Sequence, residues 1–265
     1  MSKFVVVVPR IPNWIHSHVF DEIAESVHFA LSALGHDSIQ ASDFIEGRRA
    51  ILFGAHIYDL ALVPPDTILY SLEQASCVPH LKETFAPFAL WDYSTRNIAF
   101  WGRGIHVPVG YVPELSRVHM AKEMDIDVLF CGSRSERRIA LVSELERRGL
   151  RVYWATQIYG AERDALMARA KLAINVHSQV YSEQALFEAV RVSYLLANRI
   201  AVVSEESHEG FADGLCFAPY EKLAETCEWY INYDSAREAL AESGFRWIKT
   251  REMKTFIRLA LEETP

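Results

Sequence analysis

The residues best suited to hold an anion follow the apolar run at 127–131, in the middle of the chain. Gly132 and Ser133 form a turn of small residues, and Arg137 and Arg138 lie at the start of the helix predicted after it. Backbone N–H groups in such a turn can approach an anion, and the helix N-terminus favours negative charge. The arginines add donors that match phosphate geometry. Because the segment is neither a GxGxxG motif nor a P-loop, a helix-capping serine with solvated arginines explains it equally well.

A second polar group surrounds the helix predicted to begin near residue 187. His177 comes directly after an apolar strand, and Glu188 and Arg191 lie three residues apart at the helix start. Residues at this spacing share a helix face, so a structural ion pair is one interpretation. The other is ligand binding, in which the carboxylate holds ribose hydroxyls, as acidic residues do in dinucleotide folds. His177 can then contact a phosphate or a sugar hydroxyl.

Four residues in the first half can act as a general base or orient an acceptor hydroxyl. They are His56, Glu73, Asp92 and Tyr93, and each follows or ends a predicted apolar strand. A side chain of this kind within reach of the hydroxyl can remove its proton. A lone histidine after a strand is more often a hydrogen-bonded structural residue. We nevertheless expect several of the four to gather, because the carboxyl ends of parallel strands meet at one sheet edge.

The elements that must position these residues alternate along the chain. A β-branched run at 4–8 predicts a buried first strand, and strand-helix alternation follows it. The alternation begins again at 127–131, after a charged, proline-containing stretch at 113–125. This pattern predicts parallel sheets with right-handed crossovers, and one sheet with a long insertion is the alternative. We expect an α/β protein of two Rossmann-like, doubly wound domains facing a cleft, at 1–115 and 116–240, with a terminal helix in 241–265.

The composition limits the possible partners. The chain has 265 residues, of which 50% are hydrophobic, so a large core is expected. A formal net charge of −8 argues against a general nucleic-acid binder, although it permits a local basic pocket. The four cysteines show no CxxC pair, which favours free thiols in a reducing compartment. No stretch reaches the ~20 apolar residues of a membrane span, so we predict no transmembrane segment and a cytoplasmic location.

A series of short motifs runs through residues 50–210. They are Trp91-Asp92-Tyr93-Ser94 with Asn97, Val107-Pro108-Val109-Gly110-Tyr111, the run 125–133 with Arg137 and Arg138, and the runs 159–163, 171–177, 187–198 and 202–205. In their order they resemble the motifs of bacterial GT-B-type glycosyltransferase-like proteins, and this resemblance has structural implications. It implies an acceptor side in the N-terminal domain and a nucleotide-sugar in the C-terminal domain. It also implies that a last helix, over 245–261, crosses back to the first domain.

The resemblance further implies roles for single residues. Gly132, Ser133 and Arg138 would lie by the donor phosphates, and Tyr159, His177 and Glu188 by the nucleoside or the sugar. One departure concerns Glu188. Many GT-B enzymes carry two glutamates eight residues apart before a glycine-proline turn, and this sequence lacks that turn.

We therefore expect a glycosyltransferase that moves a sugar from a nucleotide-diphosphate sugar to a carbohydrate or lipid-linked acceptor, in bacterial polysaccharide or glycoconjugate synthesis. No cofactor and no metal are expected, since arginines and a helix dipole can neutralise the diphosphate. The expected catalytic residues are Asp92, His56 and Glu73, and the expected donor-binding residues are Gly132, Ser133, Arg137, Arg138, Tyr159, His177, Glu188 and Arg191. A non-catalytic nucleotide- or sugar-binding relative is the alternative, and a sugar-nucleotide epimerase is a third.

Overall fold

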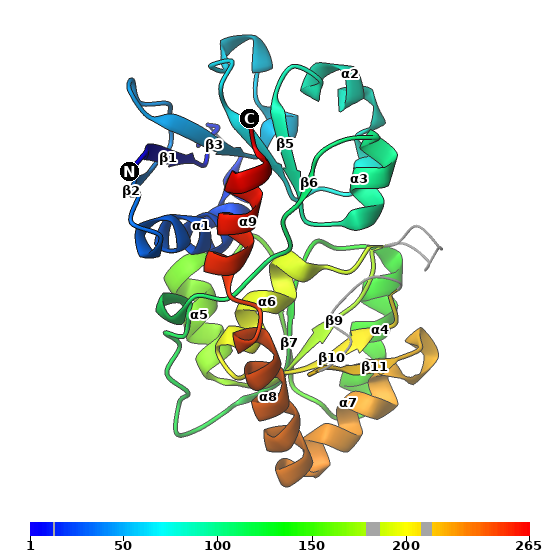
Figure 1. Ribbon diagram of the computed structural model, residues 1–265. Coiled ribbons are helices and arrows are strands. Elements are labelled where there is room, and N and C mark those ends of the chain that lie inside the picture. Colours follow the sequence, from blue (N-terminus) through cyan, green and yellow to red (C-terminus); the bar gives the residue numbers. More distant parts are fainter. Residues whose placement is uncertain (13, 179–185, 208–213) are drawn as a thin grey trace. The chain divides into compact units, whose positions relative to one another are not determined.

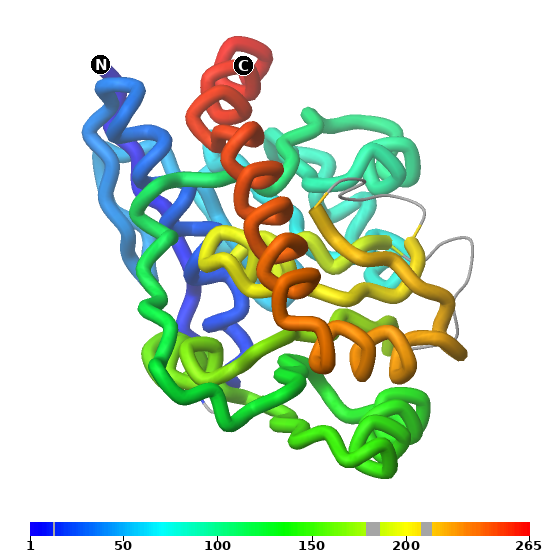
Figure 2. Tube along the Cα trace, turned by 90° about the horizontal axis from the view of Figure 1, so that it is seen from below, coloured from blue at the N-terminus to red at the C-terminus, as the bar shows by residue number. Residues whose placement is uncertain are grey.

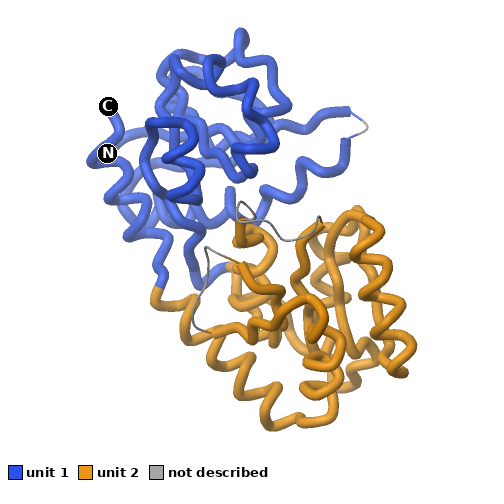
Figure 3. The backbone as a smooth tube through the Cα atoms, turned by 90° about the vertical axis from the view of Figure 1, so that its right-hand side faces the viewer, with its two compact units in different colours: residues 1–114, 251–265 blue, residues 115–250 orange. Residues whose placement is uncertain are grey.

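The chain divides into two compact units (Figure 3), seen in a computed structural model that describes residues 1–12, 14–178, 186–207 and 214–265. Unit 1 comprises residues 1–114 and 251–265, and unit 2 comprises residues 115–250. Each unit contains one parallel sheet with helices. The prediction of two Rossmann-like α/β domains is confirmed.

Unit 1 is built on a six-stranded parallel sheet in the order β2-β1-β3-β4-β5-β6 (Figure 1). Strand β1 is a continuous apolar run because both faces of the sheet are covered. The strands are β1 (Lys3–Val7), β2 (Asp37–Ala41), β3 (Arg49–Phe53), β4 (Ile68–Ser71), β5 (Ala89–Asp92) and β6 (Ile105–His106). The helices are α1 (Asp21–Ala33), α2 (Lys82–Phe85), α3 (Thr95–Trp101) and α9 (Met253–Glu263), with short 3₁₀ segments η1 (Ile15–Phe20), η2 (Ala55–Ile57), η3 (Leu60–Leu62), η4 (Ala75–Cys77), η5 (Pro79–Leu81) and η6 (Pro113–Leu115).

Helix α9 brings the end of the chain back to unit 1, where it packs against α1 (Figure 1). The Trp91 indole N–H in β5 donates to Thr264 Oγ1 at 2.8 Å, directly after α9. The single helix predicted over 245–261 is therefore two helices, because α8 (Asp234–Lys249) ends in unit 2 before α9 begins. A glycine is needed at position 110, where the chain comes back to unit 1. A Cβ atom there would lie 2.8 Å from the Arg251 carbonyl oxygen, which is too close.

Unit 2 repeats the architecture with a five-stranded parallel sheet in the order β8-β7-β9-β10-β11. Its core joins this sheet to α4 and α7, and α8 packs on α6 and β10 on another side (Figure 2). The strands are β7 (Ile126–Cys131), β8 (Val152–Ala155), β9 (Ala170–Asn175), β10 (Ala201–Glu205) and β11 (Cys216–Ala218). The helices are α4 (Glu136–Arg147), α5 (Gly160–Ala168), α6 (Ala189–Ala197), α7 (Leu223–Asn232) and α8, with η7 (Tyr220–Lys222) before α7. Among the described residues, no helix is long and apolar enough to span a membrane.

Both sheets share one topological feature that predicts where ligands bind. In unit 1 the first strand, β1, lies between β2 and β3, and in unit 2 β7 lies between β8 and β9. The direction of winding thus reverses between β1 and β3, and between β7 and β9. In open parallel sheets, ligands occupy the crevice beyond the carboxyl ends of the strands at such a switch point. His56 follows β3 and Gly132 follows β7, so each unit has predicted site residues at its own switch point.

The packing of α9 in unit 1 can be tested by substitutions on its buried and exposed faces. Ile257 is fully buried in α9, whereas Leu259 on the same helix is 44% exposed. We predict that Ile257→Ala lowers the free energy of unfolding by about 2–5 kcal/mol, because a cavity forms where α9 packs. Leu259→Ala is the matched control and should change it by about 0.5 kcal/mol or less. Urea unfolding measures both, and equal losses would contradict the packing of α9 described above.

Candidate functional site

The switch point of unit 1 carries a histidine on a tight turn. Gly54, directly after β3, has a φ of +68°, a left-handed conformation that glycine adopts without strain. The turn starts η2, and His56 extends from it. Phe20 packs against this turn. A Cβ atom added to Gly54 would lie 3.2 Å from the Phe20 ring. The position of His56 is therefore set by a glycine turn and by packing.

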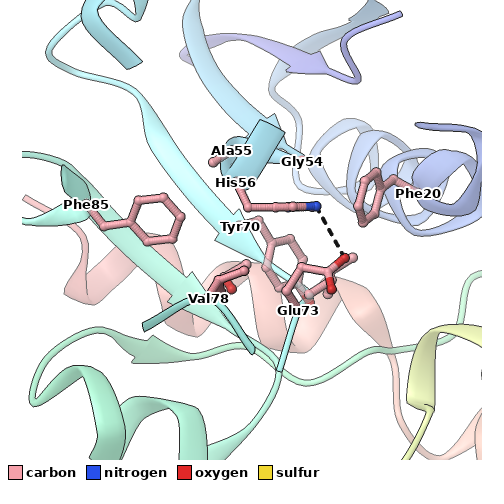
Figure 4. A pocket seen from close by; sticks show the side chains of 10 residues that line it. Phe20, Gly54, Ala55, His56, Tyr70, Glu73, Val78 and Phe85 are labelled. Carbon is pink, nitrogen blue, oxygen red and sulfur yellow. Dashed lines mark ion pairs between the residues drawn. The ribbon is translucent and has the colours of Figure 1, made fainter. Parts of the chain in front are cut away.

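His56 and Glu73 are brought together, as expected from the sequence. The His56 Nε2 atom lies 3.6 Å from Glu73 Oε1, and Figure 4 shows the ring pointing towards the carboxylate. The pair lines a pocket together with Phe20, Tyr70 and Phe85, among other residues. The Phe20 ring stands edge-on to the imidazole. The pocket thus combines apolar walls with one acid and one base.

Burial sets the charge of His56. The side chain is 17% exposed, and this burial lowers the pKa of His56 below its ordinary value of 6.5. The imidazole is therefore neutral at pH 7 and can accept a proton. A nearby carboxylate stabilises the imidazolium that forms on proton transfer. The arrangement suits general-base chemistry on a hydroxyl group.

Asp92 occupies a different environment from His56 and Glu73. It ends β5 with no solvent exposure, and its carboxylate accepts hydrogen bonds from Ser94 N, Asn97 Nδ2 and Trp101 Nε1 at 2.9–3.0 Å. Burial raises the pKa of Asp92 to about 7, and the hydrogen bonds oppose that rise. A fully enclosed carboxyl group has no path to an acceptor, so this geometry disfavours the predicted role of Asp92 as general base. Its contacts instead hold α3, from its N-cap Ser94 to its last residue, Trp101.

Asn97 was not among the predicted site residues, although it lies beneath one of them. Its amide nitrogen donates to the Glu73 carbonyl at 2.7 Å and to Asp92 Oδ1, and its Oδ1 accepts from Ala75 N at 3.0 Å. Asn97 therefore fixes the backbone on both sides of the loop that carries Glu73. The available sequence signal was the motif Trp91-Asp92-Tyr93-Ser94 with Asn97, in which Ser94 caps α3.

At the switch point of unit 2, the Gly132 N–H already has a hydrogen-bond acceptor within the protein, and the position has little room for a side chain. Its N–H donates to the Ala155 carbonyl, and its carbonyl accepts from Trp154 Nε1 at 2.8 Å. A Cβ at this position would lie 3.0 Å from the Phe130 ring and 3.4 Å from Arg191 Nη2. The amide of Gly132 is thus used within the sheet, and the glycine is needed for close packing.

Arg138 joins the loops that follow β7 and β9. Its guanidinium donates to the Val176 carbonyl and to both Ser133 O and Ser133 Oγ, at 2.9–3.2 Å. The side chain is 2% exposed, and burial lowers the pKa of Arg138 to about 10, which leaves it charged at pH 7. Arg138 therefore holds the predicted phosphate turn from below and places a positive charge beneath it.

Arg137 is engaged by Glu205, an acidic residue at the end of β10. The two side chains form a bidentate ion pair at the end of β10, and Tyr220 stacks under the guanidinium at 3.7 Å. Glu205 also accepts from the His177 backbone N–H at 3.0 Å, and His177 Nε2 lies 3.2 Å from the Glu206 carbonyl. Arg137 and His177 thus belong to one buried polar network. Part of the charge of Arg137 is therefore balanced within the protein.

Arg191 lies beside Gly132 at the switch point of unit 2. Its Nη1 donates to Asn175 Oδ1 at 2.8 Å, and its Nη2 lies 3.7 Å from Glu188, so the predicted ion pair forms with loose geometry. Asn175 in turn donates to Ser204 Oγ. The Arg191 side chain keeps 18% exposure beside Gly132. Tyr159 lies further along the same edge, as the residue before α5, and is partly buried.

Two aspartates of unit 2 have the spacing of a metal-binding pair, but they lie far from Gly132 in the sheet. Asp125 and Asp127 form an Asp-x-Asp sequence at the amino end of β7, at the sheet edge opposite to Gly132. Burial acts to raise the pKa of Asp127, but hydrogen bonds from Arg151 and Lys171 hold it well below its usual range. Across the described part of the chain, no group of three His, Cys, Asp or Glu residues is placed to hold a metal ion. The metal-independence expected from the sequence stays a prediction.

Sequence relatives come from a giant virus. No protein-family model matches the chain. The uncharacterised protein L140 of Acanthamoeba polyphaga mimivirus is 28% identical over 208 residues, which cover 72% of this chain and 67% of L140. L137 of the same virus is 28% identical over 182 residues, which cover 63% of this chain but only 25% of L137. The bacterial origin expected from the motifs is not supported by these relatives.

Structural comparison shows the fold of GT-B glycosyltransferases. An α-glucosyltransferase solved with UDP and a 13-mer DNA aligns with a TM-score of 0.64 at 8% identity, over 99% of both chains. AviGT4, a glycosyltransferase involved in avilamycin A biosynthesis, aligns with a TM-score of 0.57 at 14% identity, over 99% of this chain and 96% of AviGT4. Anabaena Alr3699/HepE, solved with UDP and glucose, gives 0.54 at 13% identity, over 100% of this chain and 99% of HepE. Identities this low establish the fold alone.

The buried state of Asp92 predicts a specific pH dependence of stability. Its pKa is raised from 3.8 to about 7 in the folded protein, so the folded state holds a proton that the unfolded state has lost. The wild-type protein should therefore lose stability relative to Asp92→Asn as pH rises from 4 to 7, by on the order of 3–4 kcal/mol. Urea unfolding of both proteins across this range provides the measurement. A difference that stays constant with pH would contradict the account.

The Arg137–Glu205 pair predicts non-additive losses. Removing either charge leaves the other buried and unpaired, so Arg137→Gln and Glu205→Gln should each lower the free energy of unfolding by about 3–5 kcal/mol. The double variant should lose far less than the sum of the two, since no lone charge remains. A double-mutant cycle by denaturant unfolding tests this. Strictly additive losses would show that the two side chains do not interact.

Proposed function

From the GT-B glycosyltransferase fold, we propose that this protein transfers a sugar from a nucleotide-diphosphate sugar to an acceptor hydroxyl. The observation that carries the proposal is the anion-suited edge of unit 2, where Ser133 and Arg191 lie at the switch point between β7 and β9. Several glycosyltransferases of the same fold were solved with UDP. The proposal assigns donor binding to unit 2 and acceptor activation to unit 1.

On the donor side, the groups divide into contacts and supports. Arg191 and the exposed Ser133 are proposed to contact the diphosphate directly. The N-terminus of α4, capped by Ser135, adds the positive end of a helix dipole. Arg138 beneath the turn adds a buried positive charge, while Arg137 and Glu205 neutralise each other. This arrangement stabilises the negative charge on a departing diphosphate.

On the acceptor side, His56 is proposed as the general base and Glu73 as the group that stabilises its charged form. His56 takes the proton of the acceptor hydroxyl, and the oxygen attacks the anomeric carbon of the donor sugar. The bond between that carbon and the diphosphate oxygen breaks, and the nucleoside diphosphate leaves. A base of this kind serves a reaction that inverts the anomeric carbon. Asp92 is assigned a supporting role, because it is enclosed by its own hydrogen-bond donors.

The acceptor and setting are further proposals. We propose a carbohydrate or lipid-linked hydroxyl as the acceptor, which would approach His56 beside the aromatic rings of Phe20 and Phe85. Some neighbours of this fold were solved with DNA, but a net charge of −8 disfavours nucleic acid as the acceptor here. We propose metal-independent transfer in glycoconjugate or polysaccharide synthesis within the cytoplasm.

A non-catalytic relative that binds a nucleotide or sugar is the rival proposal. The two differ in turnover rather than in binding. With UDP-glucose as a probe donor, incubation with a panel of carbohydrate acceptors should give a transferred product if the protein is an enzyme. Binding without product across nucleotide-sugar donors and acceptors would favour the rival, and product from the donor alone would indicate an epimerase or a hydrolase.

Donor binding gives the first test of the proposed function. We predict that UDP raises the melting temperature of the wild-type protein, and that Arg191→Ala weakens UDP binding about 10-fold or more, because a charge-assisted hydrogen bond is lost. Arg169→Ala is the matched control, since Arg169 pairs with Asp125 at the opposite sheet edge. Titration calorimetry with UDP measures the affinity of the wild-type protein and of the two variants. Equal weakening by the two variants, or no UDP, GDP, ADP or dTDP binding at all, would sink the donor assignment.

A further inference from the structure

The loop that carries Glu73 is held by one side chain on α3. The Asn97 amide nitrogen donates to the Glu73 carbonyl at 2.7 Å, and Asn97 Oδ1 accepts from Ala75 N at 3.0 Å. Asn97 itself is 3% exposed. Two backbone groups on either side of Gln74 thus depend on a single buried amide, which fixes the path of the loop next to the pocket.

Asp92 fixes the orientation of that amide. An asparagine side chain can be turned so that its nitrogen and oxygen exchange places, and the surrounding groups decide which orientation holds. Asp92 Oδ1 accepts from the same nitrogen at 2.9 Å, and Asp92 Oδ2 accepts from Trp101 Nε1 at 3.0 Å. The Ser94 N–H also donates to Asp92 Oδ1, so this oxygen is an acceptor and requires the amide nitrogen of Asn97 on its side. The oxygen must then face Ala75.

We propose that Asn97 is a positioning residue for the His56–Glu73 pair, and that Asp92 acts by orienting Asn97. This inference rests on the proposed function of the pair, in which Glu73 stabilises protonated His56. The chain of contacts runs from Trp101 through Asp92 and Asn97 to the Glu73 backbone. It gives a role to the buried polar cluster of Asp92 and Asn97, which bonds to the backbone of the pocket residue Glu73.

The titratable groups around His56 make its protonation a sensitive reporter. Glu73 faces the ring at 3.6 Å from the loop after β4, and Tyr70 lines the same pocket from β4. Tyr70 donates its hydroxyl to the Val107 carbonyl, and burial raises its pKa well above 10, so it stays neutral. Asp92 lies behind Tyr70 and influences the pKa of that phenol. Glu73 is therefore the charge at His56 that a movement of the loop changes most.

The test is an NMR titration of the His56 ring in the full-length protein. Glu73→Gln should lower the pKa of His56 further, because it removes a carboxylate that favours the imidazolium. Asn97→Ala keeps the glutamate at position 73 but removes the hydrogen bonds that hold its loop. It should therefore lower the pKa of His56 by at least about half as much as Glu73→Gln does. Ala99→Ser is the control. Ala99 is an exposed residue of the same helix, and its substitution leaves both loop contacts of Asn97 and the Asp92 contacts intact, so His56 should titrate as in the wild type.

A second measurement needs no substitution. The Ala75 amide donates to Asn97 Oδ1, so its hydrogen exchange in the wild-type protein should be slowed about 100-fold or more relative to an exposed loop amide. This result decides the matter if Asn97→Ala does not fold. Fast exchange at Ala75, or an Asn97→Ala protein in which His56 titrates as in the wild type, would overturn the positioning role.

The outcome is separable from that of the proposed function. UDP binding, measured in parallel, reports on unit 2 and should be unchanged in Asn97→Ala. Loss of the His56 response with intact UDP binding would remove the positioning role and leave donor binding standing. The reverse result, an intact His56 response without nucleotide binding, would remove the proposed transferase function and leave the loop support standing.

Discussion

The buried guanidinium of Arg138 is the interaction on which the second unit depends. It bonds to the Val176 carbonyl after β9 and to Ser133 after β7, and thereby links the two loops of the switch point. Parallel strands place these loops at one sheet edge but do not fix their distance or orientation. A charge held there by carbonyl oxygens fixes both. It also places a positive charge next to the turn, on which Glu205 and Glu188 act together with Arg137 and Arg191.

In the first unit, the loops at the switch point are positioned by a glycine turn and an amide side chain, whereas unit 2 uses a buried arginine. Its switch-point loop is set by the left-handed Gly54, and the neighbouring loop is set by the Asn97 amide. Both devices are local and depend on the sheet behind them. The two units therefore share a strand order at their switch points while presenting opposite chemistry, with arginines in unit 2 and a histidine-glutamate pair in unit 1.

Much of the fold follows from the sequence because its signals are local. The apolar run at β1 and its repetition at β7 indicated two parallel sheets, and glycines marked helix ends. The break between α8 and α9 was missed, since its cause is the docking of Tyr111 against Arg251 and Met253, far apart in the chain. Likewise His56 and Glu73 could be placed at one edge from strand order. The pairing of Arg137 with Glu205 and the enclosure of Asp92 could not, because both are set by tertiary packing.

The central claim is that unit 2 holds a nucleoside diphosphate at the switch point between β7 and β9. A crystal structure of the protein with UDP would test it most directly. The account predicts the pyrophosphate within hydrogen-bond distance of Arg191 and Ser133, at the carboxyl end of β7. A diphosphate bound at the opposite edge of the sheet, or elsewhere on the molecule, would contradict it.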